Sequence, residues 1–402
     1  MACTGSPIPV IIDTDPGIDD CIAILLALAS PELDILALNI SYGNTDLDAS
    51  YINIFKIYQS IEQHLEKHPE DKDRFPNFNG RRKPILARGT EGPLEGEMHS
   101  AQYFHGRDGL GDITNRHPEL SVESPSDFHG YLELSTKSAT EVSLDILRSK
   151  PSRSVTYIAL GPLTNLALMM RADAELVSDR IGRIVCMGGA LDVPGNTSPA
   201  AEFNFYADPY AVKELLISTD LHLGLPLDRF ILLPLDITTP HELPFPVYKE
   251  VVDPTFDSSK QPSKAHEKAV LTHFTSSFLE RTREVMLQFG KDAMELHDIV
   301  AIWCAIENPP FADDEPMTLA AGWEGTPRVF DIERAGEITR GMLVVDRRAG
   351  EVSVGTNRSE AQRDPHDTLV ENDQPGVFTI HKTPGPTVLL DLLLQRVWGR
   401  SI

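Results

Sequence analysis

Short apolar runs alternate with segments of helical spacing along the first part of the chain. Residues 7–12 form an apolar run rich in branched side chains, and Pro16 and Gly17 follow it closely. Residues 19–29 carry apolar side chains at helical spacing, and residues 34–41 form a second apolar run. A strand, a turn, a helix and a second strand in this order predict a parallel sheet with helices on its faces.

The same alternation returns in the middle and near the end of the chain. It predicts helices that begin at Thr164 and at Pro209, with Asp208 as the N-cap of the second, and a closing helix over residues 387–398. Further strands are predicted at residues 155–160, 183–187, 221–227, 230–237 and 337–345. The fold class that follows is α/β, with an open, mainly parallel twisted sheet flanked by helices.

Polar segments interrupt this pattern. Residues 62–83 and 119–138 are rich in polar residues and contain prolines, so surface insertions are expected there. Long loops are expected at residues 240–262 and 357–376. The 402 residues suggest two or three domains at roughly 150 residues per domain. Because these segments resemble loops and no internal repeat occurs, one elaborated domain over residues 1–402 is expected.

The net charge of the chain argues against some classes of binding partner. The 36 basic and 60 acidic residues give a formal net charge of −24. Nucleic acid and anionic membrane surfaces require basic patches, so neither is expected as a partner, whereas a small neutral substrate or a cation is compatible. No apolar stretch reaches the roughly 18 residues of a membrane helix, and the first residues lack the pattern of a signal peptide. A cytoplasmic protein is expected.

The four cysteines lie far apart in the sequence. Cys3, Cys21, Cys186 and Cys304 form no CxxC pair, which argues against a zinc cage built from cysteines. The last three lie in apolar runs, so they are expected to be buried, reduced thiols.

The strongest chemical signal lies at the end of the first predicted strand. Residues 13–20, DTDPGIDD, place four carboxylates within eight residues. In open α/β sheets ligands bind at the carboxyl ends of the strands, and Asp19 and Asp20 stand at a helix N-terminus, which favours negative charge. Helix capping explains a single aspartate there. Four crowded carboxylates repel one another, and an oxygen-only donor set favours a hard cation such as Ca²⁺ or Mg²⁺.

The same turn leaves a second enzyme chemistry open. An Asp-x-Asp pair after a first strand is also found in haloacid-dehalogenase-like phosphatases, in which the first aspartate is a nucleophile. Those enzymes carry Thr or Val two residues after the second aspartate, where this chain has Gly17. They also need a basic residue near the phosphate, and no Lys or Arg lies between Ala2 and Lys56. An Asp-nucleophile phosphatase is therefore the weaker alternative.

Seven motifs, taken together, resemble the signature of the inosine–uridine-preferring nucleoside hydrolases. They keep the order of the family, and the acidic turn and the AEFN segment are the most specific. The resemblance implies a Rossmann-like nucleoside hydrolase fold and hydrolysis of the N-glycosidic bond of purine or pyrimidine ribonucleosides. The motifs are VIIDTDPGIDD (10–20), YGNT (42–45), HGRDGLG (105–111), ALGPLTNL (159–166), MGG, GN, AEFN and ADP (within 187–209), LHD (296–298) and EITRGM (337–342).

The resemblance implies one bound Ca²⁺ per chain, which holds the ribose 2′- and 3′-hydroxyls and one water. Its ligands would be Asp15, Asp20, Asp298 and the backbone carbonyl of Leu160, a set of oxygens that suits a hard cation. Asp15 would also be the general base that takes a proton from the water, and the sugar would pass through an oxocarbenium-like state. Asp13 would support Asp15 or the waters of the metal. For Asp298 alone, a helix cap is the competing explanation.

Ribose recognition is implied for side chains that offer donors and acceptors to the hydroxyls. Each of them alone is also typical of turns and caps, but Glu202 and Asn204 are alternate residues, which project to one face of an extended segment. A site of this kind rejects deoxyribose, since buried partners of the missing hydroxyl stay unpaired. The implied substrate-binding residues are Asp19, Asn44, Asn196, Glu202 and Asn204, with His105 as a further residue of the pocket.

The leaving base needs a proton, and the resemblance implies His297 as its donor, because imidazole titrates near neutral pH. A lone histidine is more often structural, so this alternative stays open for both His297 and His105. The residues that contact the base are expected near residues 230–283, but no motif identifies them.

Two wider expectations concern assembly and activity. Members of the family are commonly homo-oligomers, so a dimer or tetramer is expected by resemblance. A catalytically inactive calcium- or riboside-binding protein on the same fold is the alternative from a different functional class. The intact acidic turn and Asp298 argue against it, because loss of function would affect the metal ligands first.

Overall fold

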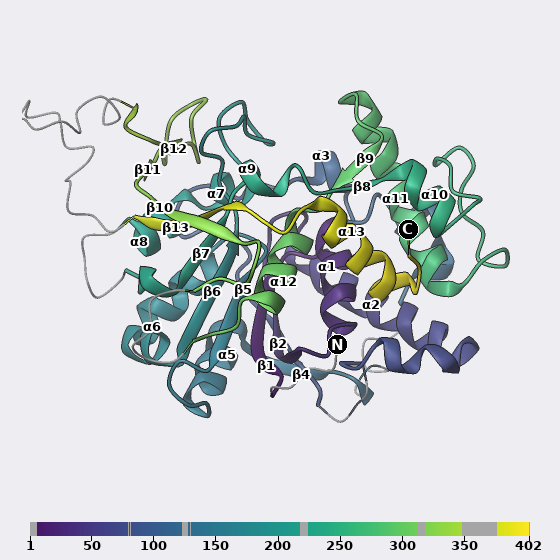
Figure 1. Cartoon of the computed structure of the whole chain (residues 1–402), viewed down its shortest axis with the longest axis horizontal. Helices are drawn as coiled ribbons and strands as arrows, with labels where there is room; N and C mark the ends of the chain where they lie inside the picture. The colour runs from purple at the N-terminus through teal and green to yellow at the C-terminus, as the bar shows by residue number, and fades with distance from the viewer. Residues whose placement is uncertain are drawn as a thin grey trace, which may run out of the picture.

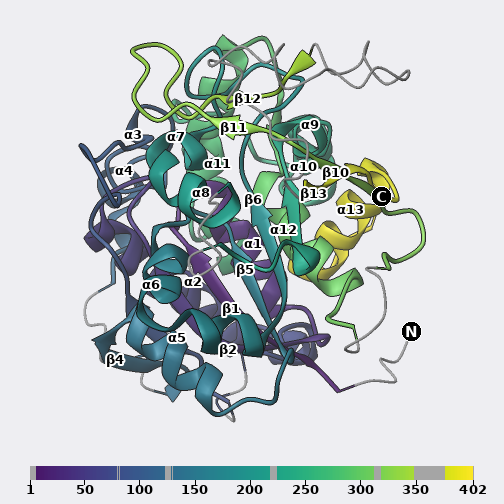
Figure 2. The ribbon, with the colours of Figure 1, turned by 90° about the vertical axis from the view of Figure 1, so that its left-hand side faces the viewer.

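The computed structural model has a central sheet with helices on both of its faces (Figure 1). It describes residues 6–78, 80, 82–122, 128, 130–217, 224–311, 318–347 and 376–401. In Figure 2 the face that carries α5 and α6 is turned toward the viewer. None of the helices in these ranges combines the length and the apolar character that a membrane span requires.

Nine strands form the main sheet in the order β10-β13-β7-β6-β5-β1-β2-β3-β4. Neighbouring strands are parallel except β10 and β13, so the predicted open, mainly parallel sheet is confirmed. The strands are β1 (Ile8–Thr14), β2 (Leu33–Ile40), β3 (Ile85–Arg88), β4 (Glu133–Ser138), β5 (Val155–Ala159), β6 (Ile181–Met187), β7 (Phe230–Leu233), β10 (Glu324–Arg328) and β13 (Val377–Lys382). Two small antiparallel pairs are β8 (Glu242–Pro244) with β9 (Ala293–Glu295) and β11 (Asp331–Ile332) with β12 (Leu343–Val344).

Alternate side chains of the central strands enter two hydrophobic cores, one on each face of the sheet. On β1, Val10 and Ile12 belong to the first core and Ile11 to the second. The first core is covered by α1 (Ile18–Leu28), α2 (Leu47–Lys67), α11 (Val270–Gln288), α12 (His297–Glu307) and α13 (Pro386–Leu393), and the second by α5 (Ala139–Arg148), α6 (Thr164–Arg180) and α8 (Pro209–Leu216). Shorter helices in the connections are α3 (Gln102–His105), α4 (Ile113–Arg116), α7 (Phe203–Ala207), α9 (Leu235–Thr238) and α10 (Phe245–Val251).

The direction in which the chain adds strands reverses between β1 and β5. From β1 the chain adds β2, β3 and β4 on one side, and β5, β6 and β7 then extend the sheet on the other. Asp13 on β1 pairs with Ala159 on β5, and the Leu160 amide donates to the Asp13 carbonyl at 2.8 Å. The crevice outside such a switch point is the usual ligand site of an open α/β sheet. The topology therefore brings the acidic turn next to Leu160.

Most elements follow the sequence pattern. The helix starts at Thr164 and Pro209 are confirmed, and Asp208 caps α8 by accepting from the Ala211 amide at 3.0 Å. The closing helix is α13, continued by a π-helical turn. The strand predicted at residues 230–237 ends at Leu233, because Pro234 has no amide hydrogen for the ladder and α9 follows. The cysteines expected to be buried thiols are free and buried, namely Cys21, Cys186 and Cys304.

The strand predicted at residues 337–345 is wrong for most of its length. Residues 337–342 lie mainly in a turn, and only β12 pairs, with β11. Gly341 has a positive φ of 77°, and the Arg340 guanidinium donates to the carbonyls of Tyr206 at 2.9 Å and Ala207 at 3.2 Å. These long-range bonds dock the turn on the end of α7, which a local pattern does not encode.

Several polar segments contain more regular structure than the sequence predicts. Helix α2 extends to Lys67 and a 3-10 helix covers Pro69–Arg74, within residues 62–83. The end of residues 119–138 is β4, at the edge of the sheet, and β8 and α10 lie within residues 240–262. The strand predicted at residues 221–227 is wrong for residues 224–227, where the chain bends, Pro226 has no amide hydrogen for a ladder, and a 3-10 helix (Leu227–Arg229) begins. Residues 221–223, and the loop predicted at residues 357–376 except for residue 376, lie outside the described residues.

Candidate active site

The turn between β1 and α1 is built around the Asp20 carboxylate. Its Oδ1 accepts from the Thr14 hydroxyl at 2.5 Å and from the Asp15 amide at 3.2 Å. Its Oδ2 accepts from the Gly17 amide at 3.1 Å and from the Asn44 side chain at 2.8 Å. These bonds hold the acidic residues of the turn in one conformation at the carboxyl end of the sheet.

The Asp15 carboxylate is fully buried and has one bonded and one unpaired oxygen. Oδ2 accepts from the Asn44 amide at 2.7 Å, whereas Oδ1 has no partner among the described residues. Glycines let neighbouring chain segments approach it, because a Cβ on Gly43 would overlap Oδ2 and one on Gly161 would lie 2.5 Å from Oδ1. A buried carboxylate oxygen without a donor requires a proton or a cation.

Three aspartates form a group that could hold a metal ion. Asp19, Asp20 and Asp298 each offer an oxygen within 4.8 Å of the other two, and Asp298 comes from the start of α12, which packs on α1. Burial raises the pKa of Asp298 well above its usual value, and the charges of Asp19, Asp20 and Asp15 raise it further. Burial and the Asp20 charge also raise the pKa of Asp15. A divalent cation relieves such crowding, so these carboxylates fit a metal.

Asp13, near the end of β1, is buried and has hydrogen-bond partners separate from those of the other aspartates. Its carboxylate accepts from the Tyr157 hydroxyl at 2.6 Å and from the Asn165 side chain at 2.9 Å. Burial raises the pKa of Asp13 to about 7, although both hydrogen bonds oppose the shift. Both oxygens of the Asp13 carboxylate therefore have a hydrogen-bond donor within the protein.

A cavity of about 540 Å³ opens beside these carboxylates, which is within the usual size of a small-molecule site. Most of the site residues predicted from the sequence line it, whereas Asp13, Asp15 and Asp20 are buried and do not. The predicted residues in the lining are Asp19, Asn44, His105, Leu160, Asn196, Glu202, Asn204, His297 and Asp298.

Glu202 and Asn204 reach the cavity through a helix cap, so the extended segment predicted for them is wrong. Glu202 is the N-cap of α7, and its carboxylate accepts from the amides of Asn204 at 2.7 Å, Phe205 at 3.0 Å and Gly189 at 2.8 Å. The Asn204 side chain donates to the Leu160 carbonyl at 2.6 Å. The capping bonds turn the chain into a helix, yet both side chains still face the same cavity.

Asn44 and Asn196 each stabilise a loop at the cavity. The Asn44 side chain donates to the Asp15 carbonyl at 3.2 Å in addition to the Asp20 carboxylate. The Asn196 side-chain oxygen accepts from the Phe203 amide at 2.9 Å. Both residues thus combine a bond typical of a turn with a place in the lining.

His297 lies between two polar partners at the start of α12. Its Nδ1 is 2.8 Å from the Thr238 hydroxyl, and its Nε2 is 3.1 Å from a carboxylate oxygen of Glu295. Burial lowers the pKa of His297, but the hydrogen bond and charge of Glu295, with the charges of Asp19 and Glu202, outweigh it and raise the pKa overall. The surroundings therefore favour the protonated imidazole.

The surroundings of His105, unlike those of His297, favour the neutral ring. Its Nδ1 accepts from the Ile18 amide at 3.1 Å, which links the HGRDGLG segment to the start of α1. Burial, with the nearby charge of His297, lowers the pKa of His105 to about 3. His105 is thus a neutral ring with its proton on Nε2, and His297 is the histidine of this cavity that favours the charged form.

Sequence reasoning missed the partners of His297 and the aromatic part of the lining. Glu295 and Thr238 belong to no motif, and Glu295 is separated from Thr238 by more than fifty residues of chain. The aromatic side chains of the lining are not in the range predicted for base contacts, residues 230–283. They are Tyr103, Phe104, Phe203 and Phe289. Tyr103 and Phe104 directly precede His105, so the residues before the HGRDGLG motif were the signal in the sequence that could have identified this part of the lining.

Known proteins resemble this chain in both sequence and fold. The model of the inosine-uridine preferring nucleoside hydrolase family matches residues 10–378. The pyrimidine-specific ribonucleoside hydrolase RihA of Citrobacter koseri is 31% identical over 339 residues, 84% of this chain and 88% of that protein. Uridine nucleosidase 1 of Arabidopsis thaliana is 37% identical over 210 residues, 52% of this chain and 53% of that protein.

Solved structures agree with these relatives at the level of the fold. A plant nucleoside hydrolase superposes with a TM-score of 0.67 at 24% identity, covering 98% of this chain and 99% of that one. A purine-preferring ribonucleoside hydrolase from Gardnerella vaginalis superposes with a TM-score of 0.66 at 20% identity, covering 97% and 98%. With the family model spanning nearly the whole sequence, the chain belongs to the inosine-uridine preferring nucleoside hydrolase family.

Proposed function

We propose that this protein hydrolyses the N-glycosidic bond of ribonucleosides to free base and ribose. The buried Asp15 carboxylate carries the proposal. Its Oδ1 has no partner among the described residues, and it lies at the switch point of the sheet, where the cavity opens. An attacking water must lose a proton, and a carboxylate with a free oxygen is the group that can take it.

A Ca²⁺ ion is part of this proposal. Asp15, Asp20, Asp298 and the Leu160 carbonyl would hold it, and their oxygen-only donor set supports a hard cation. The bond from Asn204 at 2.6 Å fixes the orientation of the Leu160 peptide group. When bound, Ca²⁺ supplies a positive charge that orients the ribose hydroxyls and lowers the pKa of nearby water.

In the proposed reaction Asp15 takes a proton from the water that attacks the anomeric carbon of the ribose. The bond between that carbon and the base nitrogen breaks, and its electron pair leaves with the base. Positive charge develops on the sugar ring, as in other glycoside hydrolyses, and the carboxylates around the cavity stabilise it. Asp13, held by Tyr157 and Asn165, keeps the end of β1 in position beneath Asp15.

The ribose hydroxyls are proposed to bind the polar residues of the lining. These residues come from separate segments of the chain, so each can meet a different hydroxyl. Asn44, Glu202 and Asn204 are buried, so a hydroxyl missing from the ligand leaves a donor or acceptor unpaired there. The residues are Asp19, Asn44, Asn196, Glu202 and Asn204.

His297 is proposed to protonate the leaving base. The carboxylate of Glu295 at 3.1 Å supports a charged imidazole, and the residue lines the cavity. His105 lines the same cavity as a neutral ring, whose remaining N–H proton is not acidic enough to be given to the base at neutral pH. The aromatic rings of Tyr103, Phe104 and Phe289 offer apolar surface to the base.

His297→Ala is expected to lower kcat for inosine by about 10²–10⁴-fold, because the base leaves slowly without a proton. p-Nitrophenyl riboside has a leaving group that needs no proton, so its kcat is expected to fall by less than about tenfold. Steady-state release of ribose and of nitrophenolate measures the two effects. His266→Ala, at a histidine whose side chain is 80% exposed, is the matched control. Equal losses for the two substrates would remove His297 from the acid role.

Ribose and base release by the purified full chain tests the proposed reaction. Inosine, uridine, adenosine, guanosine and cytidine are incubated separately with the protein and Ca²⁺, and both products are quantified. We expect equal amounts of ribose and base. We include uridine among the substrates, because two relatives are named for pyrimidine ribonucleosides and for uridine. No release from any of the five would contradict the proposal and favour the inactive riboside-binding alternative.

Assembly and location extend the proposal. We expect a homo-oligomer, a dimer or tetramer, as the family resemblance implies, and we propose a cytoplasmic location. Light scattering on the purified full chain measures the first, and a mass equal to one chain of 44.5 kDa would contradict it.

A further inference from the structure

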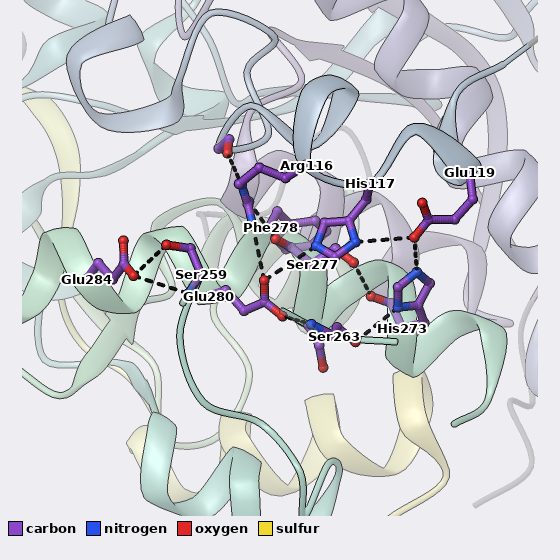
Figure 3. Close-up of polar contacts among 12 residues, drawn as sticks. Arg116, His117, Glu119, Ser259, Ser263, His273, Ser277, Phe278, Glu280 and Glu284 are labelled. Carbon is purple, nitrogen blue, oxygen red and sulfur yellow. Dashed lines mark hydrogen bonds and ion pairs between the residues drawn. The ribbon is translucent and has the colours of Figure 1, made fainter. Parts of the chain in front are cut away.

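A second group of possible metal ligands lies outside the cavity (Figure 3). His117 and Glu119 follow α4, and His273 belongs to the first turns of α11. One ligand atom of each residue lies within 4.8 Å of the other two. From these residues we propose a Zn²⁺ site with two imidazole ligands and one carboxylate, separate from the acidic calcium site and independent of the proposed hydrolysis.

The three side chains point at one place. The same Glu119 oxygen, Oε1, lies 3.2 Å from His117 Nδ1 and 2.9 Å from His273 Nε2. Zinc bonds of about 2.0–2.1 Å in a tetrahedral site separate neighbouring ligands by about 3.3 Å, so only small movements would admit the ion. Figure 3 shows both imidazoles directed toward the Glu119 carboxylate from separate segments of the chain.

The outer nitrogens of both histidines also have partners. His117 Nε2 lies 3.4 Å from an oxygen of buried Glu280, and His273 Nδ1 lies 2.9 Å from the Ser263 hydroxyl. Histidines that ligate zinc usually bond a carboxylate or another polar group through the second ring nitrogen, which fixes the tautomer and the ring plane. Arg116 holds Glu280 in place with an ion pair at 3.0 Å.

The arrangement around His117 also suits an ion. Its Nδ1 lies 3.2 Å from Glu119 and its Nε2 lies 3.4 Å from Glu280. With Zn²⁺ bound at Nδ1, Nε2 would carry the proton that Glu280 accepts. The histidines are 2–3% exposed and Glu119 is 45% exposed, so the carboxylate edge gives the ion and a fourth, water ligand a route from solvent.

The site would join α11 to the segment that follows the HGRDGLG motif. Arg116 donates to the Gly111 carbonyl at 2.9 Å and to the Ser277 carbonyl at 2.6 Å, so these two parts of the chain already contact each other. Zinc coordinated by His117, Glu119 and His273 would join these two parts of the chain through metal–ligand bonds. We therefore expect Zn²⁺ to raise the thermal unfolding midpoint of the protein.

Calorimetric titration of the full-length protein with ZnCl₂ tests the proposal, with Ca²⁺ present in saturating amount to fill the acidic site. The expected result is one Zn²⁺ per chain. His273→Ala is expected to weaken this binding by about 100-fold or more, since even indirect partners of a metal contribute 10–100-fold. His266→Ala, at the exposed histidine seven residues earlier, is the matched control and should bind as the parent does. Absence of zinc binding by the parent, or unchanged affinity in His273→Ala, would overturn the proposal.

A second variant and a spectroscopic probe cover the case in which His273→Ala fails to fold. Glu119→Gln replaces a half-exposed side chain without opening a cavity, and it is expected to weaken Zn²⁺ binding and abolish the rise in unfolding midpoint. Co²⁺ added to the calcium-saturated parent is expected to give visible bands of a four-coordinate site with nitrogen ligands. Bands typical of six oxygen ligands, or unchanged zinc affinity in Glu119→Gln, would show that these residues do not hold the ion.

Discussion

Asp15→Asn is expected to lower kcat for uridine hydrolysis by about 10²–10⁴-fold while the fold is retained. The amide cannot take a proton from the attacking water, and it removes one charge from the proposed calcium ligands. The new side chain keeps its shape, and its oxygen can still accept the bond that the Asn44 amide donates at 2.7 Å. Steady-state ribose release at saturating Ca²⁺ measures the loss.

The same variant is expected to be at least as stable as the parent when the metal is removed. Burial and the charge of Asp20 both raise the pKa of Asp15, so a neutral side chain is better tolerated at this position. Thermal unfolding in the presence of a chelator measures this. Asp48→Asn, at an aspartate whose side chain is 83% exposed, is the matched control and should keep the parental turnover. Parental turnover in Asp15→Asn would exclude Asp15 as the base.

2′-Deoxyuridine is expected to be hydrolysed with a kcat/KM about 10⁴-fold below that of uridine. Glu202, Asn204 and Asp298 are at most 6% exposed, so water cannot replace a missing hydroxyl at these groups without being ordered in the cavity. The missing 2′-hydroxyl also removes an oxygen that the proposed calcium ion would bind. Initial rates at low substrate concentration give the ratio directly.

The pair inosine and 2′-deoxyinosine is the control for this comparison. Inosine and uridine differ in the base but make the same ribose contacts. If the ribose site discriminates, the ratio of kcat/KM between ribonucleoside and 2′-deoxyribonucleoside is therefore expected to be the same for both bases. A ratio below about tenfold with both bases would show that the polar lining does not read the 2′-hydroxyl.

The sequence predicts the acidic turn well because its chemistry is local. The turn at Pro16 and Gly17 brings Asp15 and Asp20 together within a few residues, and the parallel order of strands then brings Leu160 alongside. The alternation of apolar runs likewise identifies the central strands, whose two faces are both buried.

Long-range contacts account for what the sequence does not predict. The charged state of His297 depends on Glu295 and Thr238, which meet it only in the folded chain. The turn at residues 337–342 is fixed by bonds from Arg340 to the end of α7, and no spacing within the segment reveals them. His117 and His273 are 156 residues apart in the sequence, with β4, β5, β6 and β7 between them, so nothing local relates them.

Ribose release before and after removal of calcium tests the central claim most directly, namely that the carboxylates at the first turn hold a cation on which hydrolysis depends. The full-length protein is treated with a chelator, its calcium content is measured, and uridine hydrolysis is followed before and after Ca²⁺ is restored. We predict that ribose release stops in the calcium-free protein and returns with one Ca²⁺ per chain. Undiminished ribose release by protein shown to contain no metal would contradict the account.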